Sequence, residues 1–127
     1  DANSGVIDMG TLAVDGTVQL TTNGSGNATV VNDRSLELRN ASVGGNLAAT
    51  ATTGNMTDSG ALAITGTSSF TTSASNATIT LNTTTNAFAG AVTITTNDNS
   101  ADGSTAYATA CVSWRFCAPQ QAPNLVA

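Results

Sequence analysis

Asp8–Thr22 reads DMGTLAVDGTVQLTT, and fifty residues later Asp58–Thr72 reads DSGALAITGTSSFTT, with eight of the fifteen positions identical. Further downstream, NATV at Asn27–Val30 is echoed by NATI at Asn76–Ile79. A chain that repeats itself at a fixed period is typically built from stacked copies of one structural unit. The repeat therefore predicts a stacked architecture and favours an extended surface or a fibre over a catalytic pocket.

The apolar residues alternate with small polar ones, as in Leu36-Glu37-Leu38, Ile79-Thr80-Leu81 and Val92-Thr93-Ile94. This spacing of two residues is the period of a β-strand, in which one side chain points inward and the next outward. Clusters of Gly, Asn, Asp and Ser separate the runs, and these residues tolerate the positive φ of tight turns. The pattern predicts an all-β chain.

The spacing between the apolar runs indicates which β fold to expect. One row of inward-facing residues recurs every 15 to 18 residues or so, which is about one coil of a β-solenoid. This row runs through Leu12/Val14, Val30, Leu47, Leu62/Ile64, Ile79/Leu81 and Val92/Ile94. A second row with looser steps runs through Val18/Leu20, Leu36/Leu38, Met56, Phe70 and Phe88.

On this spacing, fifty residues make three coils, and the chain is predicted to be a single-stranded parallel β-helix of about six coils. The alternative is an antiparallel β-sandwich, which the frequent turn signals also suit. A sandwich, however, does not explain the fifty-residue self-similarity.

Two regions follow from composition. Residues 1–104 hold the solenoid repeats, as two copies of the three-coil unit, whereas residues 105–127 hold three of the five aromatic residues, both cysteines and both prolines. Because an open solenoid end is a sheet edge that invites pairing, this second region is predicted either to cap the solenoid or to dock on the next subunit. The candidate docking residues are Tyr107, Trp114, Phe116, Leu125 and Val126.

The two cysteines, Cys111 and Cys117, enclose only five residues in a chain without lysine. We expect them to form a local disulfide outside the cytosol. A zinc site would need further Cys or His ligands, and the sequence has none. The chain starts at Asp1 rather than Met, which suits a new end left after removal of a signal peptide.

Charge and composition exclude several classes of function. The sequence has no lysine, no histidine and three arginines against eight acids, for a net charge of −5, so neither nucleic acid nor an anionic membrane is an expected partner. No apolar run is long enough to span a bilayer.

Without histidine, Ser-His-Asp and Cys-His catalysis are excluded. Asp8 and Asp58, at equivalent repeat positions three coils apart, are too distant to act as a carboxylate pair, and no enzyme is expected.

Two weaker ligand signals remain. Asp98, Ser100 and Asp102 alternate before Gly103 as at the start of a calcium loop, but Thr109 stands where the bidentate Glu is expected. The alternative is an Asx-rich turn, and no other cofactor is indicated. Candidate glycosylation sites in Asn-x-Ser/Thr sequences are Asn23, Asn27, Asn40, Asn55, Asn76 and Asn82.

Two strings, Ser42–Thr72 and Asn76–Asn97, resemble the coils of filamentous-haemagglutinin-like secreted β-helix adhesins of bacteria. The resemblance covers roughly residues 5–97 and rests on VGGNL at Val43–Leu47, GALAITGT at Gly60–Thr67 and NAFAGAV at Asn86–Val92. It implies a right-handed parallel β-helix, export from the cell, and adhesive or structural work at the cell surface. The chain departs from the family in its shortness, in the absence of a recognisable amino-terminal secretion cap, and in its cysteine-bearing end.

Together these observations predict an extracellular structural protein, a subunit of a surface filament built by head-to-tail stacking of short β-solenoids. Its partners would be copies of itself. The alternative is a monomeric surface adhesin or glycan-binding module that contacts a host or neighbouring cell. Glycan sites usually expose aromatic side chains, and outside residues 105–127 the only aromatics are Phe70 and Phe88, both at core-like positions.

Overall fold

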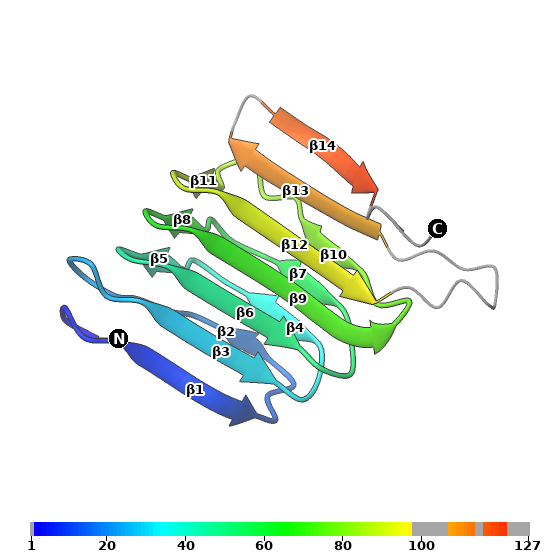
Figure 1. The fold of residues 1–127 in the computed structure, drawn as a ribbon, viewed down its shortest axis with the longest axis horizontal. Coiled ribbons are helices and arrows are strands. Elements are labelled where there is room, and N and C mark those ends of the chain that lie inside the picture. Colours follow the sequence, from blue (N-terminus) through cyan, green and yellow to red (C-terminus); the bar gives the residue numbers. More distant parts are fainter. Residues whose placement is uncertain (1, 98–106, 114–115, 122–127) are drawn as a thin grey trace.

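The computed structural model describes residues 2–97, 107–113 and 116–121. These residues form strands, turns and loops with no helix, and the strands stack as a β-solenoid of about four turns (Figure 1). Every pairing among the first twelve strands is parallel. The prediction of an all-β solenoid is confirmed, and the antiparallel sandwich is wrong.

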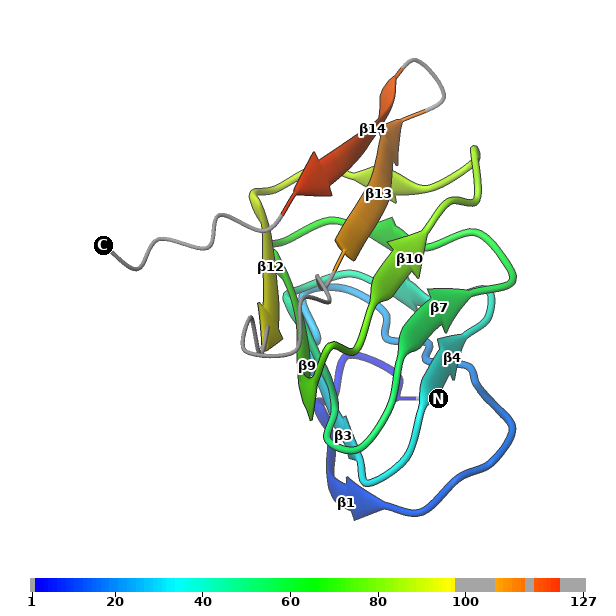
Figure 2. The ribbon, with the colours of Figure 1, turned by 90° about the vertical axis from the view of Figure 1, so that its right-hand side faces the viewer.

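Each turn passes through three faces, which Figure 2 shows from one side. The first face is a five-stranded sheet of β1 (Ile7–Leu12), β3 (Ala28–Asn32), β6 (Leu47–Ala51), β9 (Ser68–Ser75) and β12 (Val92–Asn97). The second face has six strands: β2 (Thr17–Val18), β4 (Leu36–Leu38), β7 (Met56–Asp58), β10 (Ile79–Leu81), β13 (Tyr107–Ser113) and β14 (Phe116–Gln121).

The third face is the smallest. Its sheet contains β5 (Ser42–Val43), β8 (Ala63–Ile64) and β11 (Ala87–Phe88). Two isolated parallel bridges, Thr21 with Ser42 and Ala2 with Thr22, continue this face toward the N-terminus. Four turns are therefore complete, and β12 and β13 add one further level to the first two faces.

The strand registers give the length of one turn. Ile7, Ala28, Leu47, Ser68 and Val92 follow one another in register along the first face. The differences between these numbers give turns of 21, 19, 21 and 24 residues. The predicted coil of 15 to 18 residues was too short, and the predicted six coils too many, because three faces with three corners need more chain.

This turn length changes the meaning of the fifty-residue repeat. Fifty residues make more than two turns and fewer than three, so the two copies fall on different faces. Asp8 lies in β1 of the first face but Asp58 in β7 of the second, and Val18 lies in the second face but Ser68 in the first. The first copy runs from the first face to the second, whereas the second copy runs from the end of the second face through the third face into the first. The repeat therefore does not correspond to three whole coils.

Alternate side chains of all three faces point into one narrow core. Phe70 of the first face is fully buried and meets Phe88 of the third face edge-on, with ring centroids 5.7 Å apart. The two inward rows drawn from the sequence each mix residues of several faces. Most of their members are nevertheless buried, while Leu12, Val14, Val92 and Ile94 are only partly buried.

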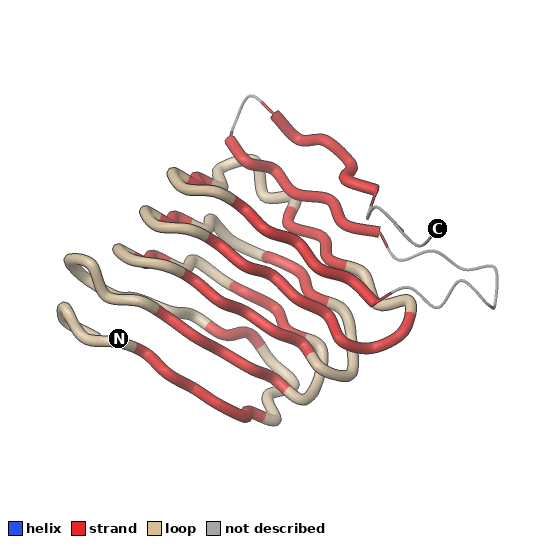
Figure 3. The backbone as a smooth tube through the Cα atoms, viewed as in Figure 1, coloured by secondary structure: helices blue, strands red, loops and turns tan. Residues whose placement is uncertain are grey.

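A column of glycines marks the corner that leads into the first face, where Figure 3 shows loop between the strands. The amide of Gly66 donates to the carbonyl of Gly45, and that of Gly45 to Gly26, both at 2.9 Å. A Cβ on Gly66 would lie 2.6 Å from the Gly45 carbonyl oxygen. At Gly26, Gly45, Gly66 and Gly90 successive turns pack too closely for a Cβ. These glycines, together with Gly5 one turn before them, have the spacing of the true turn.

Candidate functional site

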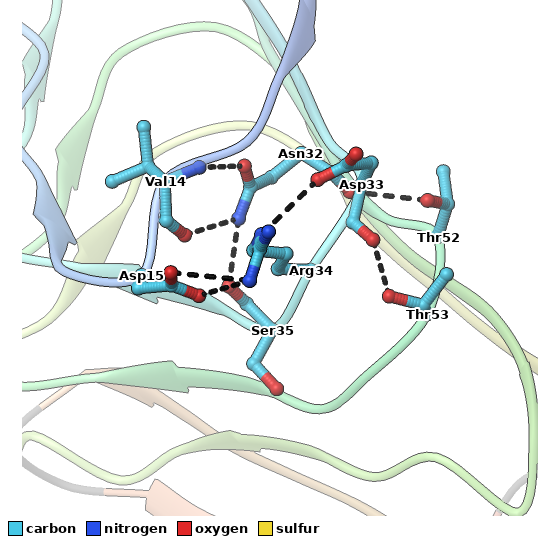
Figure 4. A network of polar contacts seen from close by, with 8 residues as sticks. All are labelled: Val14, Asp15, Asn32, Asp33, Arg34, Ser35, Thr52 and Thr53. Carbon is cyan, nitrogen blue, oxygen red and sulfur yellow. Dashed lines mark hydrogen bonds and ion pairs between the residues drawn. The ribbon is translucent and has the colours of Figure 1, made fainter.

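Asn32 holds the corner between the first and second faces (Figure 4). Its side chain is fully buried, its Nδ2 donates to the carbonyls of Val14 at 3.0 Å and Ser35 at 2.7 Å, and its Oδ1 accepts from the Val14 amide at 2.9 Å. Buried polar groups of this kind are normally satisfied by hydrogen bonds. Asn32 thus joins the first turn to the second and is left with little capacity to bind a ligand.

Arg34 lies outside this corner, between two acids of its own chain. Its Nη1 contacts the Asp15 carboxylate at 2.9 and 3.1 Å, and its Nε lies 3.7 Å from Asp33 (Figure 4). The Arg34 and Asp15 side chains are 52% and 75% exposed, so water screens the pair and its contribution to stability is about 0–1 kcal/mol. We interpret this cluster as a set of exposed ion pairs on the surface of the corner.

Asparagine side chains connect successive turns at the corners. Asn27 Oδ1 accepts the amide of Asn46 at 2.8 Å, and Asn46 Oδ1 accepts the amide of Thr67 at 2.8 Å. At another corner, Asn55 Oδ1 accepts the amide of Thr78 at 2.9 Å. Asn27 and Asn55, two of the candidate glycosylation residues, thus also have a structural role that sequence reasoning missed.

The Asp58 carboxylate accepts hydrogen bonds from a loop in the following turn of the solenoid. It accepts the amide of Asn82 at 2.9 Å and Nδ2 of Asn86 at 2.6 Å. Asn86, which is 2% exposed, accepts the amide of Leu62 at 2.9 Å. Asp8, at the equivalent position of the repeat, lies on a different face, so the prediction that the two residues stand three whole coils apart was wrong.

The remaining predicted sites are a calcium site, the docking residues and the glycosylation residues. The calcium candidates Asp98, Ser100 and Asp102 lie outside the described residues, as do Trp114, Leu125 and Val126. Within the described part of the chain, no three or more His, Cys, Asp or Glu side chains gather into a group that could hold a metal ion. Of the candidate glycosylation residues, Asn76 is partly buried, and the exposed ones are Asn23, Asn27, Asn40, Asn55 and Asn82.

The cysteines lie on a β-hairpin that continues the second face. β13 pairs in parallel with β10, and β14 then returns antiparallel to β13. The register places Cys111 directly opposite Cys117, Tyr107 opposite Gln121, and Phe116 opposite Ser113. Residues opposite each other on antiparallel strands have Cα atoms about 4.5–5.5 Å apart, within the range of about 4.4–6.8 Å that disulfides use. The backbone is therefore compatible with the predicted disulfide.

The two ends of the first face are its least covered parts. β1 and β12 are the outermost strands of that sheet, so within residues 2–97 each pairs on one side only (Figure 1). The inward apolar side chains at these ends are partly buried, whereas those of β3, β6 and β9 between them are buried. These partly buried residues are Ile7, Met9, Leu12 and Val14 at one end and Val92 and Ile94 at the other. We call these two surfaces the β1 end and the β12 end.

No helix long and apolar enough to cross a membrane occurs among the residues that the structure describes.

Comparison with known families finds one match. Residues 25–95, which are 71 of the 127 residues, match the family described as repeats of unknown function (DUF5649). The matched segment runs from just before β3 into β12, and so covers the middle turns of the solenoid. No curated protein and no solved structure matches the chain. Because the match covers more than half of the chain, the chain belongs to the family of repeats of unknown function (DUF5649).

Proposed function

We propose that this chain is an extracellular structural protein whose short β-solenoids stack head to tail into a surface filament. The observation that carries the proposal is a pair of strand edges, those of β1 and β12 at opposite ends of one parallel sheet, which no other described strand pairs with. An unpaired edge presents a row of free N–H and C=O groups that can pair with a strand of another chain.

The apolar side chains at the two ends favour the same partner. Ile7 and Met9 at the β1 end and Val92 and Ile94 at the β12 end continue the inward columns of the middle turns, but are only partly buried. Stacking a second copy would remove their remaining apolar surface from water, which stabilises the joint by about 25 cal/mol for each Å² buried.

The register of such a joint follows from the columns. Continuing them places Ile7 of one copy beside Val92 of the next, Met9 beside Ile94, and Asp8 beside Thr93. Asp8 is the only charged residue in β1, and β12 has none, so no like charges meet. Because the two surfaces differ, the contact is heterologous, and a heterologous contact that does not close into a ring gives a filament.

The extracellular location rests on composition and resemblance. The chain is rich in Thr, Ser and Asn, has no lysine, and resembles the coils of secreted β-helix adhesins. Two cysteines in register on a hairpin also suit an oxidising compartment.

Assembly of the full chain tests this function. In at least one of two buffers, oxidising or reducing, we expect filaments by negative-stain microscopy and sedimentation coefficients that grow with concentration. Ile94→Asp, which places a charge in the β12 end, should abolish assembly. The matched variant Thr95→Asp, whose side chain is exposed on the same strand, should retain it. Circular dichroism should first show that both variants keep their β structure.

A chain that stays monomeric at every concentration in both buffers would contradict the proposal. If that monomer bound a defined glycan on an array, the alternative of a surface adhesin would replace it.

A further inference from the structure

The second face extends further than the first at the β12 end. β12 follows β9 in the first face and β13 follows β10 in the second, so β12 and β13 occupy the same level of the solenoid. β14 lies one level beyond β13 (Figures 1 and 2). It is also the only strand that runs antiparallel to its neighbour in the described part of the chain.

A second copy that continued the solenoid in register would need three positions at this end. In one copy, Ala2 precedes Thr22 on the third face, β1 begins the first face and β2 begins the second. The second copy would therefore place its Ala2 beside β11, its β1 beside β12 and its β2 beside β13. No described strand occupies the first two positions, but β14 occupies the third.

We propose that β14 is a gate on head-to-tail assembly. This inference rests on the proposed function, and it adds that the joint forms only after β14 leaves β13. The antiparallel pairing of β14 (Phe116–Gln121) is then replaced by the parallel pairing of β2 (Thr17–Val18) from the next copy. Because β2 is the shorter strand, the exchange is favourable only together with the pairing of β1 on β12 and the burial of the apolar ends.

The cysteine pair is the latch of this gate. Cys111 and Cys117 lie opposite each other on β13 and β14, so a disulfide between them would hold the start of β14 beside β13. Dithiothreitol opens the latch by giving two electrons and two protons to the disulfide. The S–S bond breaks into two thiols, and dithiothreitol closes into a cyclic disulfide.

The test compares the concentration at which the full chain begins to form pelletable filaments in three forms. These are the oxidised wild type, the wild type reduced with dithiothreitol, and the double variant Cys111→Ser/Cys117→Ser. We expect the oxidised wild type to need a concentration at least about tenfold higher than the double variant. Dithiothreitol should bring the wild type to the value of the variant and leave the variant itself unchanged.

Two results would overturn the gate, and they differ in what they say about the filament. If the oxidised wild type, with its disulfide verified by mass spectrometry, assembles at the same concentration as the double variant, the gate is wrong while the filament stands. If no form assembles, the proposed function fails as well. The reduced wild type keeps the test decisive should the double variant fail to fold.

Discussion

The middle strands and the end strands of the first face follow the same alternation but differ in burial. In β3 and β6 every inward side chain is buried, whereas in β1 and β12 the inward side chains are only partly buried. The alternation in the sequence therefore sets which side chains point inward, and the neighbouring turns set how well they are covered. This is the general behaviour of a solenoid, in which each unit completes its core with its neighbours.

The largest expected difference in the free energy of unfolding is between a middle position and an end position of the same inward column. Phe70→Ala should lower the free energy of unfolding by about 3–5 kcal/mol, because a fully buried ring leaves a cavity. Ile94→Ala, next to it in register on β12, should cost only roughly 1 kcal/mol in the monomer, because Ile94 is partly exposed. Urea denaturation of both variants measures the difference, and equal losses would mean that the β12 end is already covered.

A smaller effect concerns the corners that allow turns to stack. Gly66→Ala should destabilise the fold by roughly 1–3 kcal/mol, because its Cβ would press on the carbonyl of Gly45 in the preceding turn. Gly16→Ala is the control, since nothing lies within 4 Å of the Cβ that it adds. Thermal melts should show a clear loss for the first variant and almost none for the second. Similar melts would contradict the close packing of the glycine column.

The smallest effect has the opposite sign. Ser68 is 2% exposed in the inward column between Leu47 and Val92, and its hydroxyl has no hydrogen-bond partner. Ser68→Ala removes an unsatisfied buried polar atom and should leave stability unchanged or raise it by up to about 1 kcal/mol. Ser69→Ala, on the outer side of the same strand, should change stability by less than about 0.5 kcal/mol. A marked loss in Ser68→Ala would reveal a partner for this hydroxyl.

The fold class could be predicted because alternation and turn residues are local properties of the sequence. The turn length could not be predicted from the apolar rows, because all three faces show the same apolar–polar–apolar pattern. A row through Val30, Leu47 and Ile64 passes from the first face to the third without any change in that pattern. The glycines before each first-face strand carry the correct spacing, since their role depends on contact between turns rather than on alternation.

The polar corners and the C-terminal hairpin were harder to predict for a similar reason. Asn32 is buried at the end of β3 and Asn27 is exposed just before the same strand, and only the neighbouring turn decides which amide each side chain meets. Likewise, the pairing of β13 with β10 joins residues about thirty positions apart, and such long-range pairing has no signal in the local sequence. The change of composition near residue 105 marked the region without showing that it extends the second face.

The most direct test of the central claim mixes two variants, each blocked at one end. Met9→Asp blocks the β1 end and Ile94→Asp blocks the β12 end, so each variant keeps one intact surface. With the hairpin cysteines reduced, we predict that each variant alone sediments as a monomer and that an equimolar mixture forms dimers but no filaments. A mixture that stays monomeric while the wild type assembles, or a single variant that forms filaments alone, would contradict head-to-tail joining through the β1 and β12 ends.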